Sequence, residues 1–252
     1  MPLTIPTAYV HRTDAMRQIL KLLQHNERYV DGCFDLRFAP VEAAKHEAYG
    51  AFIEEMTRYR RKKNGIANVR AVYLLDNLRV FYWLFVSEGD GLVAEIESLK
   101  NTTNKKDRVQ FAGYEALRLP RQGEEGSPWT WQFRADRYKR LEEEITEAVR
   151  VKDFETIRQW SYNLKRAPSF AGVRKQAYKL AKKAEAEWQR SAKGVFPAGS
   201  FAMGWQGRFK EAKQVPLYKS QIRKHLDATS VGVNADGELF GSGSARPEVM
   251  SI

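Results

Sequence analysis

One short segment limits the possible folds more than any other, because it is apolar on both of its faces. Residues 79–86 (RVFYWLFV) place three aromatic rings on one face of an extended chain and Val, Tyr, Leu and Val on the other. Such a strand is typical of the centre of a sheet that is covered on both sides. Residues 69–75 (VRAVYLL) are also strand-like, and Asp76-Asn77 between the two segments favours a tight turn. The sequence therefore predicts a central hairpin.

The segments around this hairpin alternate between helical and extended patterns. The pattern predicts a helix from the N-cap Thr13 to Leu23, a strand at 29–38, a helix from Pro40 to Lys63, a helix at 91–100 and a strand at 108–119. After the first helix, the order is strand, helix, strand, strand, helix, strand. That order is the one of a βαββαβ fold. We therefore expect an α+β protein with a ferredoxin-like or RRM-like βαββαβ core and a C-terminal helical region.

The chain divides into four expected regions. Residues 12–133 form the α+β core, and 134–192 form a basic helical region with helices at 135–150, 153–165 and 169–191. Asp153 and Ser169 are the expected N-caps of the last two helices. Residues 193–227 are expected to be a loop-rich segment that packs on the core, with a short helix near 217–226. Residues 228–252 are rich in Gly, Ser and Asn, and we expect a disordered tail there.

The charge of the chain points to a polyanionic partner. The 252 residues include 42 Lys and Arg against 31 Asp and Glu, a formal net charge of +11. Nucleic acid, DNA or RNA, is the first partner to consider for such a chain, and other protein subunits are possible partners too. No apolar run approaches the ~20 residues that cross a bilayer, so no membrane is expected. The first residues lack the pattern of a secretory signal, which favours a cytoplasmic protein.

The first candidate site is a basic cluster at the end of the expected helix 40–63. Five of the six residues in 58–63 are cationic: Arg58, Arg60, Arg61, Lys62 and Lys63. Cations at a helix C-terminus offset the helix dipole, and this structural role is enough to explain some of the five. Five cations exceed what this requires, so we also predict contacts to phosphates.

The second candidate site lies on the expected helix 169–191. Its cations are Arg174, Lys175, Lys179, Lys182 and Lys183, while a different side of the helix is apolar. Lys175, Lys179 and Lys183 form a row of about 12 Å at 1.5 Å per residue. Residues 134–193 hold 16 Lys and Arg against 9 Asp and Glu, a net charge of +7. The alternative is a merely solvated helix face. Nothing resembles a base-reading motif, so backbone contacts are expected.

The aromatic face of 79–86 allows two interpretations. Packing in the core is favoured over an exposed platform on which bases stack. A helix over each face of the sheet would exclude the platform.

The sequence assigns no catalytic residue, no cofactor and no metal. Cys33 is the only cysteine, and the four histidines are dispersed. Enzymatic activity is left open, although the sequence argues against it. A metal-independent ribonuclease would use side chains as acid and base, and His11, His25 and His46 are its first candidates.

The order of elements over residues 30–86 carries a family resemblance. VDGCFDLRF, a helix with a basic end, VRAVYLL and then VFYWLF are similar to the core of rolling-circle replication initiators of filamentous phages and plasmids, which carry a His-hydrophobic-His motif. Phe81 and Trp83 stand where that family has metal-binding histidines. Aromatic hydrocarbon rings cannot ligate Mg²⁺ or Mn²⁺. The resemblance implies a protein that keeps the fold without the nuclease activity.

These features together favour a non-catalytic nucleic-acid-binding protein that contacts the phosphate backbone through basic helices, and a mobile genetic element is the source to consider first. One alternative is a metal-independent RNA endonuclease, a crRNA-binding subunit of a CRISPR-type system or a degenerate replication initiator. CRISPR subunits use similar βαββαβ domains, so the fold does not separate these options. The other alternative is a phage or plasmid inhibitor or adaptor that binds an acidic host protein surface.

Overall fold

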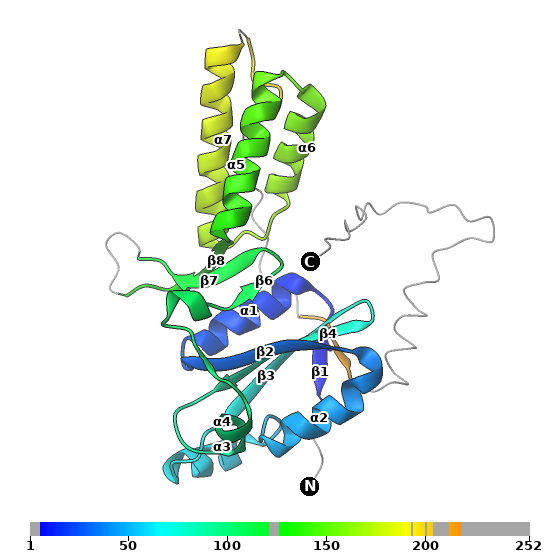
Figure 1. The fold of residues 1–252 in the computed structure, drawn as a ribbon, viewed down its shortest axis with the longest axis vertical. Helices are drawn as coiled ribbons and strands as arrows, with labels where there is room; N and C mark the ends of the chain where they lie inside the picture. Colours follow the sequence, from blue (N-terminus) through cyan, green and yellow to red (C-terminus); the bar gives the residue numbers. More distant parts are fainter. Residues whose placement is uncertain (1–5, 121–125, 193, 200, 204–211, 218–252) are drawn as a thin grey trace, which may run out of the picture.

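The computed structural model describes residues 6–120, 126–192, 194–199, 201–203 and 212–217. It shows an α+β protein with a mixed six-stranded sheet, a three-stranded antiparallel sheet and an arm of three helices (Figure 1). In Figure 1 the arm rises from the small sheet, and the large sheet lies at the other end of the molecule. Among the described helices, none is long and apolar enough to cross a membrane.

The large sheet has the strand order β5-β2-β4-β3-β1-β9. The predicted hairpin is confirmed: β3 (Val69–Asp76) pairs antiparallel with β4 (Arg79–Val86), with Asp76 opposite Arg79. Asn77 turns the chain between them with a φ of 55°, a left-handed conformation that Asn tolerates better than most residues. β4 is flanked on its other edge by β2 (Arg28–Asp35), also antiparallel. The strand that is apolar on both faces is therefore central.

Three short strands complete the large sheet. β5 (Lys100–Asn101) pairs antiparallel with β2 at one edge. β1 (Thr7–Tyr9) lies parallel to β3 at the other edge, and β9 (Gln214–Pro216) pairs antiparallel with β1. The sheet thus combines an early segment and a late segment of the chain at one edge.

Both faces of the large sheet are covered. On one face, α1 (Arg12–Leu23) and the small sheet bury Trp83 and Phe85 at 2% and 0% exposure. On the other face, Leu84 and Val86 pack with residues at the end of α2 (Ala39–Ala48) and with Val93 of α4 (Leu92–Ile96). Figure 1 shows α1 on one side of the sheet and α2, α3 and α4 on the other. Trp83 and Phe85 are therefore core side chains, Phe81 is only partly buried, and an open stacking platform on this face is excluded.

The long helix expected at 40–63 is wrong, because the chain forms two helices there. α2 ends before Gly50, and α3 (Glu55–Lys63) begins after a break. Gly50 has a φ of 83°, a left-handed conformation that closes the last turn of a helix and is open to glycine without strain. Its amide donates to the carbonyl of Glu47 at 2.8 Å.

Two neighbouring boundaries also differ from expectation. The strand expected at 29–38 ends at Asp35, whose side chain accepts a hydrogen bond from the amide of Arg37 and starts a 3-10 turn at Leu36–Phe38. The first helix begins at Arg12 with His11 at the N-cap position, so Thr13 is not the cap.

The fourth strand of the expected core lies elsewhere in the chain. The helix expected at 91–100 stops at Ile96, and Lys100 and Asn101 form β5. Residues 108–119 do not join the large sheet. They form β6 (Gln110–Phe111) and β7 (Tyr114–Arg118) of the small sheet, after a 3-10 turn at Lys105–Asp107. The expected single strand is broken at Ala112 and Gly113, which have φ values of 48° and 78° and so make a tight turn.

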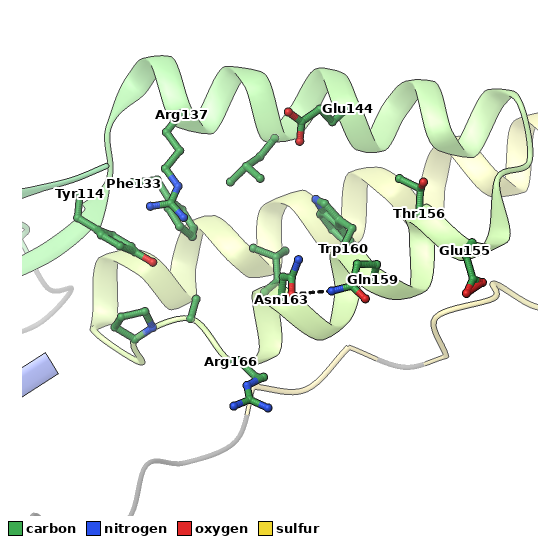
Figure 2. Close-up of a pocket in the computed structure, with 14 residues that line it drawn as sticks. Tyr114, Phe133, Arg137, Glu144, Glu155, Thr156, Gln159, Trp160, Asn163 and Arg166 are labelled. Carbon is green, nitrogen blue, oxygen red and sulfur yellow. Dashed lines mark hydrogen bonds between the residues drawn. The ribbon is translucent and has the colours of Figure 1, made fainter. Parts of the chain in front are cut away.

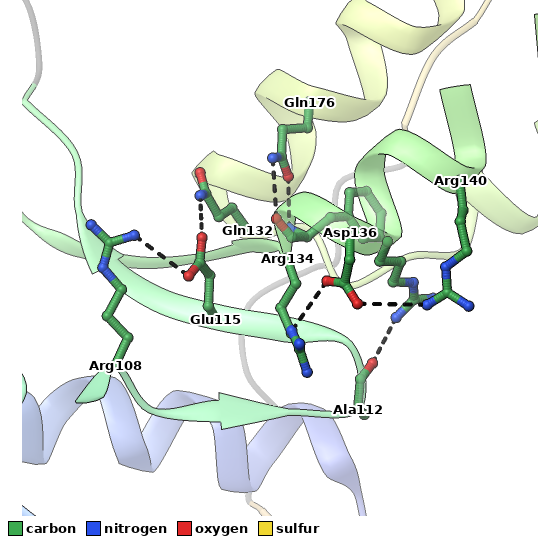
Figure 3. Close-up of polar contacts among 10 residues, drawn as sticks. Arg108, Ala112, Glu115, Gln132, Arg134, Asp136, Arg140 and Gln176 are labelled. Atoms are coloured by element: carbon green, nitrogen blue, oxygen red, sulfur yellow. Dashed lines mark hydrogen bonds and ion pairs between the residues drawn. The ribbon is translucent and has the colours of Figure 1, made fainter. Parts of the chain in front are cut away.

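The small sheet joins the arm to the rest of the protein. β8 (Trp129–Phe133) pairs with β7, and its Trp131 donates from Nε1 to the carbonyl of Met16 on α1 at 2.9 Å. On the arm side, Gln176 of α7 bonds to both the amide and the carbonyl of Phe133 (Figure 3). Figure 3 also shows the ion pairs of Arg134 and Arg140 with Asp136. The bonds of Gln176 fix the arm to the small sheet, while the ion pairs of Asp136 lie within the start of α5.

The three helices of the arm match the sequence prediction closely. They are α5 (Ala135–Arg150), α6 (Phe154–Lys165) and α7 (Ala171–Ser191). Asp153 is confirmed as an N-cap, since its carboxylate accepts from the Thr156 amide at 3.0 Å. Ser169 is not a cap, because α7 begins one residue later than expected, with Phe170 at the N-cap position.

The region after the arm is described only in part. Phe196 and Met203 belong to the main hydrophobic cluster, and Val215 of β9 packs with Ala8 and Tyr73. The helix expected near 217–226 and the tail expected at 228–252 lie outside the described residues, apart from Leu217.

Candidate nucleic-acid interface

The basic cluster of α3 splits into inward and outward side chains. Arg58 is only 9% exposed, and its guanidinium donates to the carbonyl of Ala51 at 2.8 Å and to the carbonyl of Val69. Burial lowers the pKa of Arg58 from its usual value, and the nearby Arg70 acts in the same direction. Arg58 thus holds α3 against the sheet and is not presented to a phosphate.

Arg61 also has a structural role. It is half-buried, and its Nη2 donates to the carbonyl of Ala67 at 2.8 Å. The remaining three cations, Arg60, Lys62 and Lys63, are exposed, and in the described part of the chain none of them makes an ion pair. Three of the five predicted cations of α3 are therefore available to a ligand.

A groove of about 620 Å³ is lined by one of these three cations, Lys62. It is bounded by the end of α1, the side of α3 and the start of β3. Four of its lining residues are Lys or Arg and one is acidic: Lys21, Arg58, Lys62 and Arg70 against Glu55. Glu55 is engaged by Arg70 at 2.8 Å. Tyr59, which is 67% exposed, adds an aromatic ring to the wall.

Sequence reasoning missed the contribution of α1 and β3 to this groove. Lys21 lies in the last turn of α1, His25 follows the end of that helix, and Arg70 points to solvent from a strand. The sequence could not show that Lys21 and Arg70 line the same groove as Lys62, because this depends on how three separate elements pack.

The second basic cluster is a row along α7. Lys175, Lys179 and Lys182 are exposed, and within the described residues none of them has an ion-pair partner. Lys183 pairs with Glu142 of α5 at 3.0 Å, and Arg174 is half-buried. The apolar side of α7, including Leu180 and Trp188, is buried in the arm. Two lysines of the expected row, Lys175 and Lys179, are therefore exposed without an ion-pair partner among the described residues, whereas the third, Lys183, pairs with Glu142.

The fold does not bring the two basic clusters together. α3 lies at the foot of the molecule, beneath the large sheet, and α7 lies in the arm at the opposite end (Figure 1). The protein therefore presents two separate basic surfaces, which we call the α3 surface (Lys21, Arg60, Lys62, Lys63 and Arg70) and the α7 surface (Lys175, Lys179 and Lys182).

A cavity of about 610 Å³ opens between α5 and α6 in the arm. Figure 2 shows Trp160 and the hydrogen-bonded pair Gln159 and Asn163 on its α6 wall, and Arg137 beside Tyr114 at one end. The Arg137 guanidinium lies 4.7 Å from the Tyr114 ring centre. None of the predicted nucleic-acid-binding residues lines this cavity.

The three histidines considered as an acid and base occupy different environments. His11 and His25 are exposed at the two ends of α1. His46 is fully buried on α2, where its Nδ1 is hydrogen-bonded to the Tyr73 hydroxyl at 2.7 Å. Burial, followed by the charge of Lys45, lowers the pKa of His46 to about 4. Across the described ranges, no three His, Cys, Asp or Glu side chains gather as a metal site.

Comparison of the chain with protein-family models, curated protein sequences and solved structures finds no match.

Proposed function

We propose that this protein is a non-catalytic nucleic-acid-binding protein that contacts phosphates through the α3 and α7 surfaces. The observation that carries the proposal is the set of exposed cations without ion-pair partners in the described chain. Arg60, Lys62 and Lys63 form one group, and Lys175, Lys179 and Lys182 form the other. Cations that lie free on one surface are available to displace the counterions of a polyanion.

The distribution of the acidic residues supports this proposal. Some other cations of the arm are neutralised by carboxylates, as in Arg150 with Glu187 at 2.9 Å and Lys183 with Glu142, whereas Lys152 and Arg158 make no ion pair within the described residues. The α7 surface carries no such carboxylate partner for its three lysines within the described residues. Its lysines recur every three or four residues, so they follow one side of the helix over about 10 Å at 1.5 Å per residue.

We also propose that residues 28–101 form a ferredoxin-like core in which β5 takes the place of the expected strand 108–119. The order β5-β2-β4-β3, with β4 antiparallel to both of its neighbours, supports this assignment. The resemblance to replication initiators rests on the same segment.

The test is the salt dependence of binding. Fluorescence anisotropy with labelled single-stranded DNA, duplex DNA and RNA is measured between low and physiological salt. Neutralisation of Z phosphates gives a log–log slope of about −0.9Z for a duplex and about −0.7Z for a single strand. We expect a slope that corresponds to several phosphates. The absence of any binding at low salt would overturn the proposal.

Charge-matched variants assign the binding to a surface. Lys175, Lys179 and Lys182 are replaced by Ala in one variant, and Arg60, Lys62 and Lys63 in another. The control variant replaces Arg79, Lys105 and Lys106, which are exposed cations outside both surfaces. Each site variant is expected to reduce the duplex slope by up to about 3, while the control retains it. Equal losses in all three variants would mean that only the net charge matters.

A further inference from the structure

A cavity of about 530 Å³ lies between the large sheet and the small sheet, away from both basic surfaces. Residues of β2, β4, β6 and the turn after β6 line it, together with Arg12 at the start of α1 and Asp76 at the end of β3. It shares no lining residue with the groove beside α3 or with the cavity in the arm.

The apolar part of this cavity is aromatic. Phe81, Trp83 and Phe111 line it, and the ring of Phe111 meets the ring of Trp83 edge-on, with centres 5.2 Å apart and planes at 88°. Phe81 and Phe111 also meet edge-on, at 5.6 Å. Trp83 and Phe111 are buried, and Phe81 is the partly buried ring against which a flat group can pack.

Trp83 lines this cavity and carries an unsatisfied hydrogen-bond donor. The side chain is 2% exposed, and its Nε1 has no acceptor among the described residues. Buried donors in folded proteins are nearly always paired. Because this nitrogen is itself buried, an acceptor on a ligand reaches it only after the rings that line the cavity shift.

The polar wall of the cavity carries carboxylates. Asp31 is bonded to Lys100, and Asp76 accepts from Arg12 at 2.5 Å. Both carboxylates line the cavity and are partly buried, so each keeps one cation and has lone pairs left for donors on a ligand. The exposed thiol of Cys33 lies on the same wall.

We propose that this cavity binds a single unstacked nucleobase of a nucleotide or of a single strand. A nucleobase has a flat face for the aromatic rings, an edge acceptor for Trp83 and edge donors for a carboxylate. The side chains of Phe and Trp have the flat face without an edge acceptor, and those of Tyr and His carry fewer edge groups than a base. For a nucleic-acid strand, the proposal rests on the proposed function. For a free nucleotide, it stands by itself.

The reactivity of the Cys33 thiol reports whether the cavity is occupied, because Cys33 is the only cysteine in the chain and is exposed in the cavity wall. The rate of its reaction with a thiol reagent is followed with and without each nucleoside monophosphate. Ribose 5-phosphate is the control for the phosphate and sugar alone. We expect at least one nucleotide to slow the reaction severalfold and ribose 5-phosphate to leave it unchanged. Equal rates with all of these additives at millimolar concentration would overturn the proposal.

Oligonucleotides separate this proposal from the proposed function. A single strand is expected to protect Cys33, and a duplex, whose bases are stacked, is not. Salt-dependent strand binding without protection of Cys33 would remove the base site and leave the proposed function intact. Protection of Cys33 by nucleotides without any strand binding would keep the base site and remove the proposed function.

A matched pair of tryptophan variants tests the hydrogen bond. Trp83→Phe keeps a ring and removes the donor, and it is expected to weaken nucleotide protection about 5-fold, which corresponds to one lost hydrogen bond. Trp129→Phe is the control, because Trp129 Nε1 is also buried and unpartnered but lies outside the cavity. Equal protection in both variants and the wild type would exclude Trp83 as the donor. If Trp83→Phe does not fold, Asp31→Asn gives the corresponding test of the carboxylate.

Discussion

Gly172 at the start of α7 lies directly against the backbone of Trp131 on β8. A Cβ atom built on Gly172 would come within 2.5 Å of the Trp131 carbonyl oxygen. The Gly172 amide donates to the hydroxyl of Thr130 at 3.1 Å, so the first turn of the helix is bonded to the strand that it approaches. The absence of a side chain at this residue sets the distance between the arm and the small sheet.

Gly172→Ala is therefore expected to destabilise the protein. Alanine favours a helix over glycine by about 1 kcal/mol, but the close contact with backbone atoms costs more, typically 1–3 kcal/mol for an overpacked site. Chemical denaturation should show a lower midpoint. Ala171→Ser, a change at the exposed neighbouring residue, is the control and should leave the midpoint nearly unchanged. A Gly172→Ala variant that is as stable as the wild type would contradict the contact.

Substitutions of Arg58 and Arg60 are expected to have different effects. Replacing Arg58 lowers the stability of the protein, and replacing Arg60 lowers its affinity for nucleic acid. Arg58→Met leaves the carbonyls of Ala51 and Val69 without their buried donor, and we expect a loss of about 3 kcal/mol in the free energy of unfolding. Arg60→Met, at an exposed position on the same helix, should keep the stability and weaken nucleic-acid binding. Denaturation and anisotropy measured on both variants check this. A stable Arg58→Met variant would mean that the guanidinium does not anchor α3.

Much of the fold was predictable because it follows from local periodicity. The apolar runs at 69–75 and 79–86, with Asp76-Asn77 between them, and the helical spacing in 135–191 are local patterns that indicate their elements without the rest of the chain. The break at Gly50 was harder, because an isolated glycine in a helical pattern is compatible with a continuous helix. The two-residue strand β5 was not predictable, since only pairing with β2 defines it.

The candidate site was predictable only in its residue types. A run such as 58–63 says that cations are concentrated there, and it does not say which of them turn inward. Arg58 and Arg61 do so because carbonyl groups of Ala51, Ala67 and Val69 need donors at those places. The cavity that we assign to a nucleobase combines five elements that are distant in the sequence, so no local pattern could have indicated it.

The buried His46 predicts a specific loss of stability in acid. Its pKa is lowered to about 4 in the folded protein, whereas an unfolded chain binds the proton near pH 6.5. Between these values the unfolded state holds more protons than the folded state, so stability falls as the pH falls from about 6.5 to about 4. The loss attributable to this residue is about 3 kcal/mol, and it grows no further below pH 4.

The measurement is the free energy of unfolding from pH 7.5 to pH 4, compared between the wild type and His46→Phe. The variant loses the hydrogen bond with Tyr73 and starts less stable at pH 7.5. It cannot take up this proton, so its stability should decline less steeply below pH 6.5.

The control is His25→Gln, a change at an exposed histidine, and its stability should decline as that of the wild type does. The charged side chains around His46, namely Glu42, Lys45 and Glu97, are present in all three proteins, so their titration cancels in the comparison to first order. Parallel curves for the wild type and His46→Phe would show that His46 takes up its proton equally in the folded and unfolded chains.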